Sequence, residues 1–220
     1  MKYLLFDFDG TLADSSKGIY FSFAKACKEI NLECPSFNDF RKQIGPPIQV
    51  ISKNIFPNIK SQELVVLKKK FREDYDKKSY KIITWYSDVE KSLIELNKKN
   101  YNFALVSNKP TFLCETLLEN KSLTKYFDLI IGIDYCERFG ESSFQDKSYA
   151  IKYALKILNI NPSQAIYVGD TLSDMKNANS LGMLFIAAKY GFFSWNDNNL
   201  PNMYINKFSE IIDMIKFSKI

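Results

Sequence analysis

Acidic side chains follow two apolar runs of this sequence, at the points where buried strands are expected to end. Asp7 and Asp9 lie at the end of the run at residues 3–8, Asp170 ends the run at residues 165–170, and Asp174 lies one helical turn further on. Residues two positions apart point to the same side of a strand, so we expect Asp7 and Asp9 to face one region. Carboxylates gathered at one sheet edge would repel and raise each other's pKa above about 3.9 unless a cation neutralised them. A hard divalent ion with oxygen ligands fits such a cluster, and Mg²⁺ fits best for phosphate chemistry.

Each of these motifs also has a purely structural interpretation. The pair Asp9-Gly10 is typical of a turn, and Asp170 or Thr171 can cap the helix that follows. The segment at residues 107–109, Ser-Asn-Lys, carries little information by itself. The arrangement of the motifs favours a site, because ligands of open α/β sheets bind outside the carboxyl ends of the strands, where all of these segments are expected.

Histidine is absent from the sequence. Its absence excludes Ser-His-Asp hydrolysis, imidazole acid-base catalysis and metal sites that use histidine ligands. The four cysteines are scattered and form no CxxC pair, so we interpret them as thiols rather than as disulfides or a zinc site. Any chemistry must therefore use carboxylates, hydroxyls, lysines or a bound ion.

Apolar runs alternate with helical patterns through most of the chain. Five short runs are expected to form buried parallel strands, at residues 3–8, 102–107, 128–133, 165–170 and 183–188. Apolar residues at helical spacing lie between them, at residues 87–97, 111–120, 147–158 and 173–181. This alternation predicts an α/β fold with a parallel sheet that is covered by helices on both faces.

The segment from residue 16 to residue 83 differs, because it contains consecutive helical patterns without a convincing strand. Pro46 and Pro47 interrupt the pattern near its middle, since proline lacks the amide that a helix interior needs. We therefore expect an α/β core domain of residues 1–15 and 84–220, and an all-helical domain of residues 16–83 inserted after the first strand. A chain of 220 residues is long enough for this organisation.

Charge and hydropathy exclude two classes of partner. The net charge of +5 would favour anions, but the lysines lie on the expected wet faces of helices, and no basic motif with interleaved aromatic residues accompanies them. No stretch approaches the roughly 20 apolar residues that span a bilayer, and Asp7 and Asp9 interrupt the first apolar run before it could form a signal peptide. We therefore expect neither nucleic acid nor a membrane as partner, and a cytoplasmic location.

Four segments resemble, in order and spacing, the four motifs of the haloacid dehalogenase (HAD) superfamily of phosphohydrolases. They are "DFDGTL" at residues 7–12, "VSNK" at residues 106–109, an isolated lysine before a helix, and "GDTLSD" at residues 169–174. The resemblance covers nearly the whole chain and implies a Rossmann-like parallel-sheet core. The inserted segment resembles the helical cap domain of phosphoglycolate phosphatases.

The resemblance implies a catalytic role for each matching carboxylate. Asp7 would be the nucleophile that forms an aspartyl-phosphate, and Asp9 would be the general acid and base. Mg²⁺ would be held by the Asp7 carboxylate, the Asp9 backbone carbonyl and Asp170. Asp174 would support the metal directly or through water.

Phosphate binding is the implied role of Gly10, Ser107, Asn108 and the lysine of the third motif. We favour Lys147 as that lysine, because it opens a helix whose N-terminal dipole also attracts an anion. The common Gly-Lys-Pro form of the motif is missing, and the preceding segment resembles only loosely the Gly-Ser-rich variant of some phosphoglycolate-phosphatase-like members. Lys109 is the rival.

The implied function is Mg²⁺-dependent hydrolysis of a small phosphomonoester, with phosphoglycolate as the leading candidate. Alternatives on the same fold are a phosphotransferase or mutase similar to β-phosphoglucomutase, a pyrophosphatase, a nucleotidase and a non-catalytic binding protein. The expected partner is a small phosphorylated metabolite. Both a monomer and a homodimer remain open.

Overall fold

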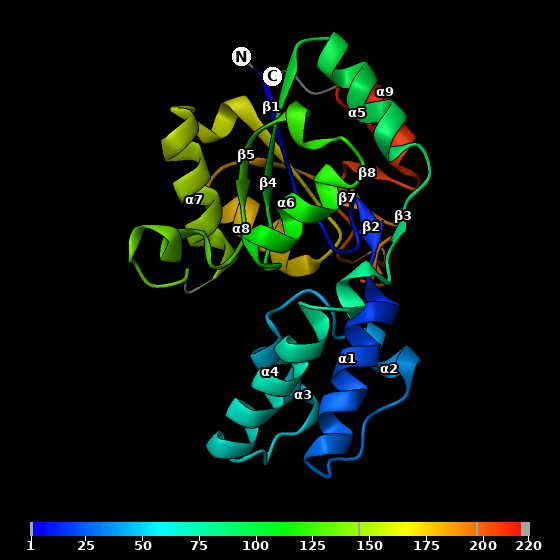
Figure 1. Ribbon diagram of the computed structural model, residues 1–220. Helices are drawn as coiled ribbons and strands as arrows, with labels where there is room; N and C mark the ends of the chain where they lie inside the picture. The colour runs from blue at the N-terminus through cyan, green and yellow to red at the C-terminus, as the bar shows by residue number, and fades with distance from the viewer. Residues whose placement is uncertain (1, 145, 197, 217–220) are drawn as a thin grey trace. The chain divides into compact units, whose positions relative to one another are not determined.

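The computed structural model describes residues 2–144, 146–196 and 198–216 (Figure 1). The chain forms two compact units, one of residues 1–13 and 85–220 and the other of residues 14–84. We call them the core unit and the helical unit. That residues 16–83 act as a cap domain stays a prediction. No helix in the described part of the chain has the length and hydropathy to cross a bilayer.

Strands and helices alternate along the core unit. They are β1 (Lys2–Phe6), α5 (Val89–Lys98), β4 (Tyr101–Val106), α6 (Thr111–Glu119), β5 (Phe127–Ile131), α7 (Lys147–Leu158), β6 (Ala165–Gly169), α8 (Leu172–Ser180), β7 (Leu184–Ala188), β8 (Tyr204–Ile205) and α9 (Ile211–Met214), with 3₁₀ helices at Thr124–Tyr126, Tyr135–Phe139, Pro162–Gln164 and Phe208–Glu210. The six strands form one sheet in the order β5-β4-β1-β6-β7-β8, and every neighbouring pair is parallel. The predicted α/β fold with a parallel sheet is confirmed.

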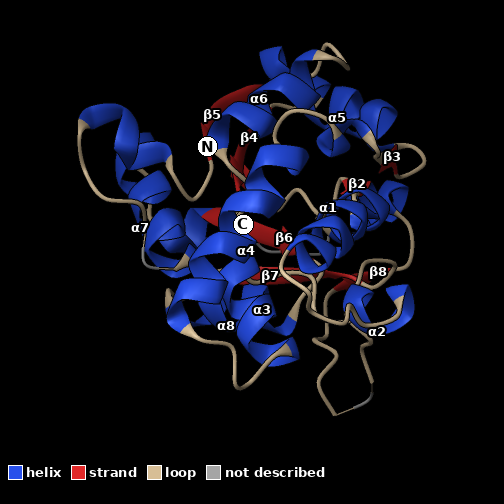
Figure 2. Ribbon diagram, turned by 60° about the horizontal axis from the view of Figure 1, so that its bottom comes forward, coloured by secondary structure: helices blue, strands red, loops and turns tan. Residues whose placement is uncertain are grey.

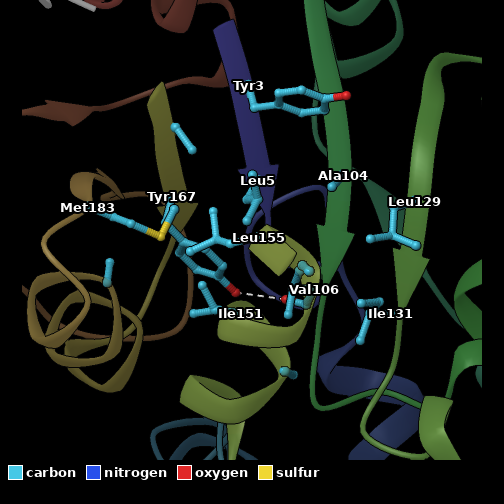
Figure 3. Close-up of a cluster of buried hydrophobic side chains, with 14 of the residues drawn as sticks. Tyr3, Leu5, Ala104, Val106, Leu129, Ile131, Ile151, Leu155, Tyr167 and Met183 are labelled. Carbon is cyan, nitrogen blue, oxygen red and sulfur yellow. Dashed lines mark hydrogen bonds between the residues drawn. The ribbon is translucent and has the colours of Figure 1, made fainter. Parts of the chain in front are cut away.

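One face of the sheet is covered by α7 and α8 and buries a hydrophobic cluster. Leu5 of β1 lies in this cluster with Val106, Ile151, Leu155 and Tyr167 (Figure 3). The Tyr167 hydroxyl donates a hydrogen bond of 2.7 Å to the Val106 carbonyl oxygen, so its polar end is satisfied inside the core.

The opposite face of the sheet buries aromatic side chains. Phe6 follows Leu5 on β1 and therefore points to the other face. Its ring centroid lies 5.8 Å from those of Phe103 and Phe208 and 6.3 Å from that of Phe127. Figure 2 shows the strands of the core unit between α5 and α6 on one side and α8 on the other. The central strand is therefore buried on both sides, which explains its continuous apolar run.

The helical unit contains α1 (Ser16–Glu29), α2 (Phe37–Arg41), α3 (Ile48–Ile55), α4 (Ser61–Tyr75) and a 3₁₀ helix at Ser79–Lys81. Its centre is aromatic: the Phe23 ring centroid lies 4.6 Å from that of Phe40 and 6.2 Å from that of Phe56. Where the chain passes between the units, β2 (Ala13–Asp14) pairs with β3 (Thr84–Trp85).

A buried carboxylate connects the helices of the helical unit. Asp74 of α4 accepts hydrogen bonds from Lys25 at 2.6 Å, Ser79 at 2.5 Å and Ser22 at 2.8 Å. The Lys25 hydrogen bond, followed by that from Ser79, lowers the pKa of Asp74 to about 2. The charged form of Asp74 therefore stabilises the packing of α1 against α4.

Candidate active site

The predicted site residues follow the strands at the carboxyl edge of the sheet. Asp7 follows β1, Ser107 follows β4 and Asp170 follows β6. Because β1 lies between β4 and β6, the three positions are neighbours. Backbone hydrogen bonds continue the ladder past the strand ends: the Asp7 amide donates to Val168 at 2.9 Å, and the Ser107 amide donates to Ile131 at 2.9 Å. The sheet therefore fixes the backbone of the site.

Lys147 connects two of the buried carboxylates. Its Nζ atom lies 2.7 Å from Oδ2 of Asp7 and 2.6 Å from Oδ1 of Asp174, and all three side chains are at most 4% exposed. Lys147 is the first residue of α7, whose N-cap Asp146 accepts a hydrogen bond of 2.8 Å from the Ser148 amide. Burial by itself lowers the pKa of Lys147, but the charges of Asp174 and Asp7 overcome this effect and hold its pKa well above the usual value. Lys147 is therefore a cation beside the predicted nucleophile.

Three buried carboxylates lie close enough together to share one cation. One oxygen atom each of Asp7, Asp170 and Asp174 lies within 4.8 Å of the others. Burial raises the pKa of Asp7 to about 6, against the lowering effect of Lys147 and reinforced by the charge of Asp174. Burial also raises the pKa of Asp170 well above its usual value, and the charges of Asp174 and Asp7 add to this. Neighbouring carboxylates raise the pKa values of Asp7 and Asp170, as expected from the sequence, but burial is the larger cause of both increases.

This acidic cluster fits a hard divalent cation. Its ligand atoms are carboxylate oxygens, which Mg²⁺ prefers, and of the three carboxylates Asp7 and Asp174 contact the ammonium group of Lys147. The Oδ1 atom of Asp170 is buried and has no hydrogen-bond partner among the described residues. A buried acceptor without a partner costs about 1–3 kcal/mol, and coordination of a cation would remove that cost. The contribution of the Asp9 backbone carbonyl stays a prediction.

Thr171 and Asp174 form a capping box at the start of α8. The Thr171 hydroxyl donates to Oδ2 of Asp174 at 2.6 Å and accepts from the Asp174 amide at 3.1 Å. The other carboxylate oxygen of Asp174, Oδ1, contacts Lys147. The structural interpretation of this motif is therefore confirmed, with Thr171 as the N-cap, while the role of Asp174 in supporting a metal stays a prediction.

Two glycines and a backbone amide pack against Asp170. Gly10 has a φ of +80°, and a Cβ atom there would lie 2.1 Å from Oδ2 of Asp170. A Cβ atom on Gly191 would lie 2.2 Å from the Asp170 Cβ atom. The Phe192 amide donates a hydrogen bond of 2.7 Å to Oδ2 of Asp170. Sequence reasoning missed Gly191 and Phe192, because they lie in the loop after β7 and act through small size and a backbone amide.

Asp9 lies apart from the acidic cluster. Its Oδ1 atom lies 3.1 Å from Nζ of Lys109, whose side chain is 1% exposed, whereas the Asp9 side chain is 17% exposed. β1 ends at Phe6 and both aspartates lie in the following loop, so the alternation of a strand does not align Asp7 with Asp9. The two aspartates instead pair with different lysines. That the two carboxylates face one region stays a prediction.

Ser107 lies beside the predicted nucleophile. Its hydroxyl hydrogen-bonds to Asp7 and so helps to lower the pKa of that carboxyl, and its Oγ atom accepts from the Lys109 amide at 3.3 Å. Asn108 follows in the same loop. That Ser107, Asn108, Gly10 and Lys147 bind phosphate stays a prediction. The Ser107 hydroxyl, the Phe8 amide and the Lys147 ammonium group all contact the Asp7 carboxylate, and donors of these kinds also bind phosphate oxygens.

The arrangement is suited to nucleophilic chemistry that needs no histidine. Both oxygens of the Asp7 carboxylate are held: Oδ1 accepts from the Phe8 amide at 2.8 Å, and Oδ2 contacts Lys147. A carboxylate that is fixed in this way, next to a cation site, can form a covalent intermediate with an electrophile. Asp9 provides a second carboxyl group that can carry a proton.

Comparison with known proteins gives consistent matches. A phosphoglycolate phosphatase of Aquifex aeolicus is 29% identical over 98% of this chain and 97% of its own length, and one of Vibrio cholerae is 25% identical over 87% and 86%. The crystal structure of a predicted phosphatase from Clostridium acetobutylicum superimposes with a TM-score of 0.88 at 28% identity, covering 98% of both chains. The sequence model of haloacid dehalogenase-like hydrolases matches residues 4–188. The chain therefore belongs to the haloacid dehalogenase-like hydrolase family.

Proposed function

We propose that this protein is a Mg²⁺-dependent phosphatase that hydrolyses a small phosphomonoester through an aspartyl-phosphate on Asp7. One observation carries the proposal: the buried Asp7 carboxylate contacts Lys147 at 2.7 Å and lies within cation-sharing distance of Asp170 and Asp174. Lys147 and a divalent cation held by the three carboxylates would together neutralise the charges of the phosphate and of the attacking carboxylate.

The proposed reaction has two displacements at phosphorus. In the first, an Asp7 oxygen forms a bond to phosphorus, the bond to the ester oxygen breaks, and Asp9 donates a proton to the leaving alkoxide. In the second, Asp9 removes a proton from water, the water oxygen bonds to phosphorus, and the bond to Asp7 breaks. Inorganic phosphate leaves, and Asp9 is again protonated. Mg²⁺, when bound, neutralises charge on the phosphate oxygens.

Lys147 and Ser107 would bind the phosphate during both displacements. The Lys147 ammonium already contacts Asp7, so a phosphoryl group on that carboxylate would meet the same positive charge. The Ser107 hydroxyl, which contacts Asp7, can turn to a phosphate oxygen. The Phe8 amide holds the nucleophile in place through both steps.

Phosphoglycolate is the leading substrate candidate, because the relatives from Aquifex aeolicus and Vibrio cholerae carry the name phosphoglycolate phosphatase. We would measure kcat/KM with Mg²⁺ for phosphoglycolate, a nucleoside monophosphate, pyrophosphate and a hexose phosphate. Phosphoglycolate should give the highest value. A higher value for another compound would reassign the substrate, and return of phosphate to a second sugar hydroxyl would identify a mutase.

The function itself is tested with Asp7→Asn, which removes the nucleophile and preserves its shape. Release of phosphate should require Mg²⁺, should stop in a chelator, and should fall to the background level in the variant while its circular dichroism spectrum remains native. Appreciable activity of Asp7→Asn would contradict the role of Asp7. Failure of the wild-type protein with Mg²⁺ to hydrolyse any of the compounds, p-nitrophenyl phosphate included, would favour a non-catalytic binding protein.

A further inference from the structure

The two aspartates of the first motif have separate cationic partners. Lys147 contacts Asp7 and belongs to the acidic cluster, whereas Lys109 contacts Asp9 at 3.1 Å. Both lysine side chains are at most 4% exposed. The structure therefore places one buried ammonium group beside the proposed nucleophile and another beside the proposed acid and base.

The position of Lys109 is fixed at both ends of its side chain. Its Nζ atom lies 5.5 Å from the centroid of the Phe8 ring, and that ring packs edge-to-face on Trp85 at 5.5 Å. A desolvated cation above an aromatic face is attracted by the negative face of the ring. At the backbone, the Lys109 carbonyl oxygen accepts from the Ile133 amide at 3.3 Å. These contacts fix the position of the Lys109 ammonium group, and the Asp9 carboxylate is oriented by its ion pair with that group.

A charged side chain at this position needs a reason beyond packing. A buried charge is costly, and an apolar side chain of similar length could fill the same space without that cost. Asp9 lies in the loop after β1 and is the more exposed of the two first-motif aspartates. General acid catalysis requires a distance of about 2.6–3.2 Å between the oxygen of the acid and the atom that receives its proton. A carboxyl group without a fixed orientation would rarely maintain that distance.

We propose that Lys109 is a positioning residue, whose ammonium group holds the Asp9 carboxyl group in the orientation from which it exchanges its proton. This inference rests on the proposed function. When the ester bond breaks, the proton moves from Asp9 to the leaving oxygen, and the negative charge that remains on Asp9 is balanced by Lys109. When water attacks, Asp9 recovers a proton. Lys109 itself gains and loses no proton.

The role is tested through the leaving group. Phenyl phosphate and 2,4-dinitrophenyl phosphate have the same ring and the same phosphate, but dinitrophenolate leaves without protonation, whereas phenolate needs a proton. We would measure kcat/KM for both compounds with wild-type protein, Lys109→Met, Lys109→Gln and Lys109→Arg. Both rates come from one preparation, so their ratio does not depend on the fraction of folded protein.

Lys109→Met should lower kcat/KM for phenyl phosphate by about 10- to 100-fold, which is part of the 10²–10⁴-fold that a positioned general acid contributes. The value for 2,4-dinitrophenyl phosphate should fall less than about threefold, since no proton is needed. Lys109→Gln should behave in the same way. Lys109→Arg retains the charge and should recover most of the phenyl phosphate activity.

Lys147→Met is the matched control, because it removes a buried ammonium group from the nucleophile instead. It should lower both rates by similar factors. Equal losses for both compounds in the Lys109 variants would overturn the inference and leave only a structural role, while the proposed function would stand. Activity of Asp7→Asn, or an inactive wild-type protein, would instead overturn the proposed function, and the role of Lys109 with it.

Discussion

Without a divalent cation, the protein should become more stable when Asp7 loses its charge. The pKa of Asp7 is raised from 3.8 to about 6 in the folded protein, chiefly by burial. Folding therefore disfavours the carboxylate, and ionisation of Asp7 weakens the fold as the pH rises from 3.8 through about 6. A shift of about two units corresponds to about 3 kcal/mol at neutral pH. Asp7→Asn keeps the shape of the side chain and removes the charge, so it should increase the free energy of unfolding by up to about that amount.

Asp74→Asn is the matched control with the opposite sign. The pKa of Asp74 is lowered to about 2, mainly by the hydrogen bond from Lys25. The stabilisation from its charge is complete above the unfolded pKa of about 3.8 and is lost as the pH falls through about 2. A lowering of just under two units corresponds to about 2 kcal/mol, which Asp74→Asn should remove at neutral pH.

The assay is urea unfolding followed by circular dichroism, in a chelator, at pH 7.5 and pH 4.5. At pH 4.5, linkage with these pKa values predicts that Asp7→Asn increases the free energy of unfolding by only about 1 kcal/mol, compared with about 3 kcal/mol at pH 7.5. Asp74→Asn should decrease the free energy of unfolding by about 2 kcal/mol at both pH values. A variant Asp7→Asn that is less stable than wild type at pH 7.5, or whose gain does not shrink at pH 4.5, would refute the reasoning. Mg²⁺ should stabilise the wild type more than Asp7→Asn, because the variant lacks one ligand charge.

Other variants separate the parts of the site. Lys147→Ala should reduce the rate of p-nitrophenyl phosphate hydrolysis by orders of magnitude and Lys109→Ala much less, as steady-state assays would show; the reverse order would make Lys109 the third-motif lysine. Gly191→Ala should displace Asp170 and raise the Mg²⁺ concentration needed for half-maximal activity, and an unchanged Mg²⁺ requirement would contradict the packing argument. Ser107→Ala should raise KM for phosphomonoesters by roughly tenfold, the worth of one hydrogen bond to a charged group, and an unchanged KM would remove Ser107 from phosphate binding.

Much of the fold and part of the site could be predicted from local patterns. Apolar runs marked the five longer strands, and the polar residues directly after them, such as Asp7 and Asp170, were therefore expected at one edge. Lys147 was favoured because it starts a helix. The two-residue strand β8 and the single-turn helix α9 were not predicted, because segments so short contain no hydrophobic period.

The remaining features of the site depend on contacts that cannot be recognised from the types of the residues that make them. Gly191 leaves room for Asp170 because it has no side chain, and Phe192 donates a hydrogen bond to Asp170 from its backbone amide. Residues in any loop can do both, so the sequence does not identify them. The division of Asp7 and Asp9 between two lysines follows from where β1 ends, and strand ends are poorly marked in sequence. The distribution of charge in the site is therefore set by contacts between distant parts of the chain, which residue type alone does not indicate.

The central position of β1 has a consequence during synthesis on the ribosome. This strand is synthesised well before its two neighbours, which begin at Tyr101 and Ala165. At about 5–20 residues per second, the nascent chain carries an unpaired apolar segment for on the order of ten seconds before β6 is available. A chaperone that binds extended hydrophobic peptides would find a target in β1, and premature termination before Ala165 would leave one edge of that strand permanently unpaired.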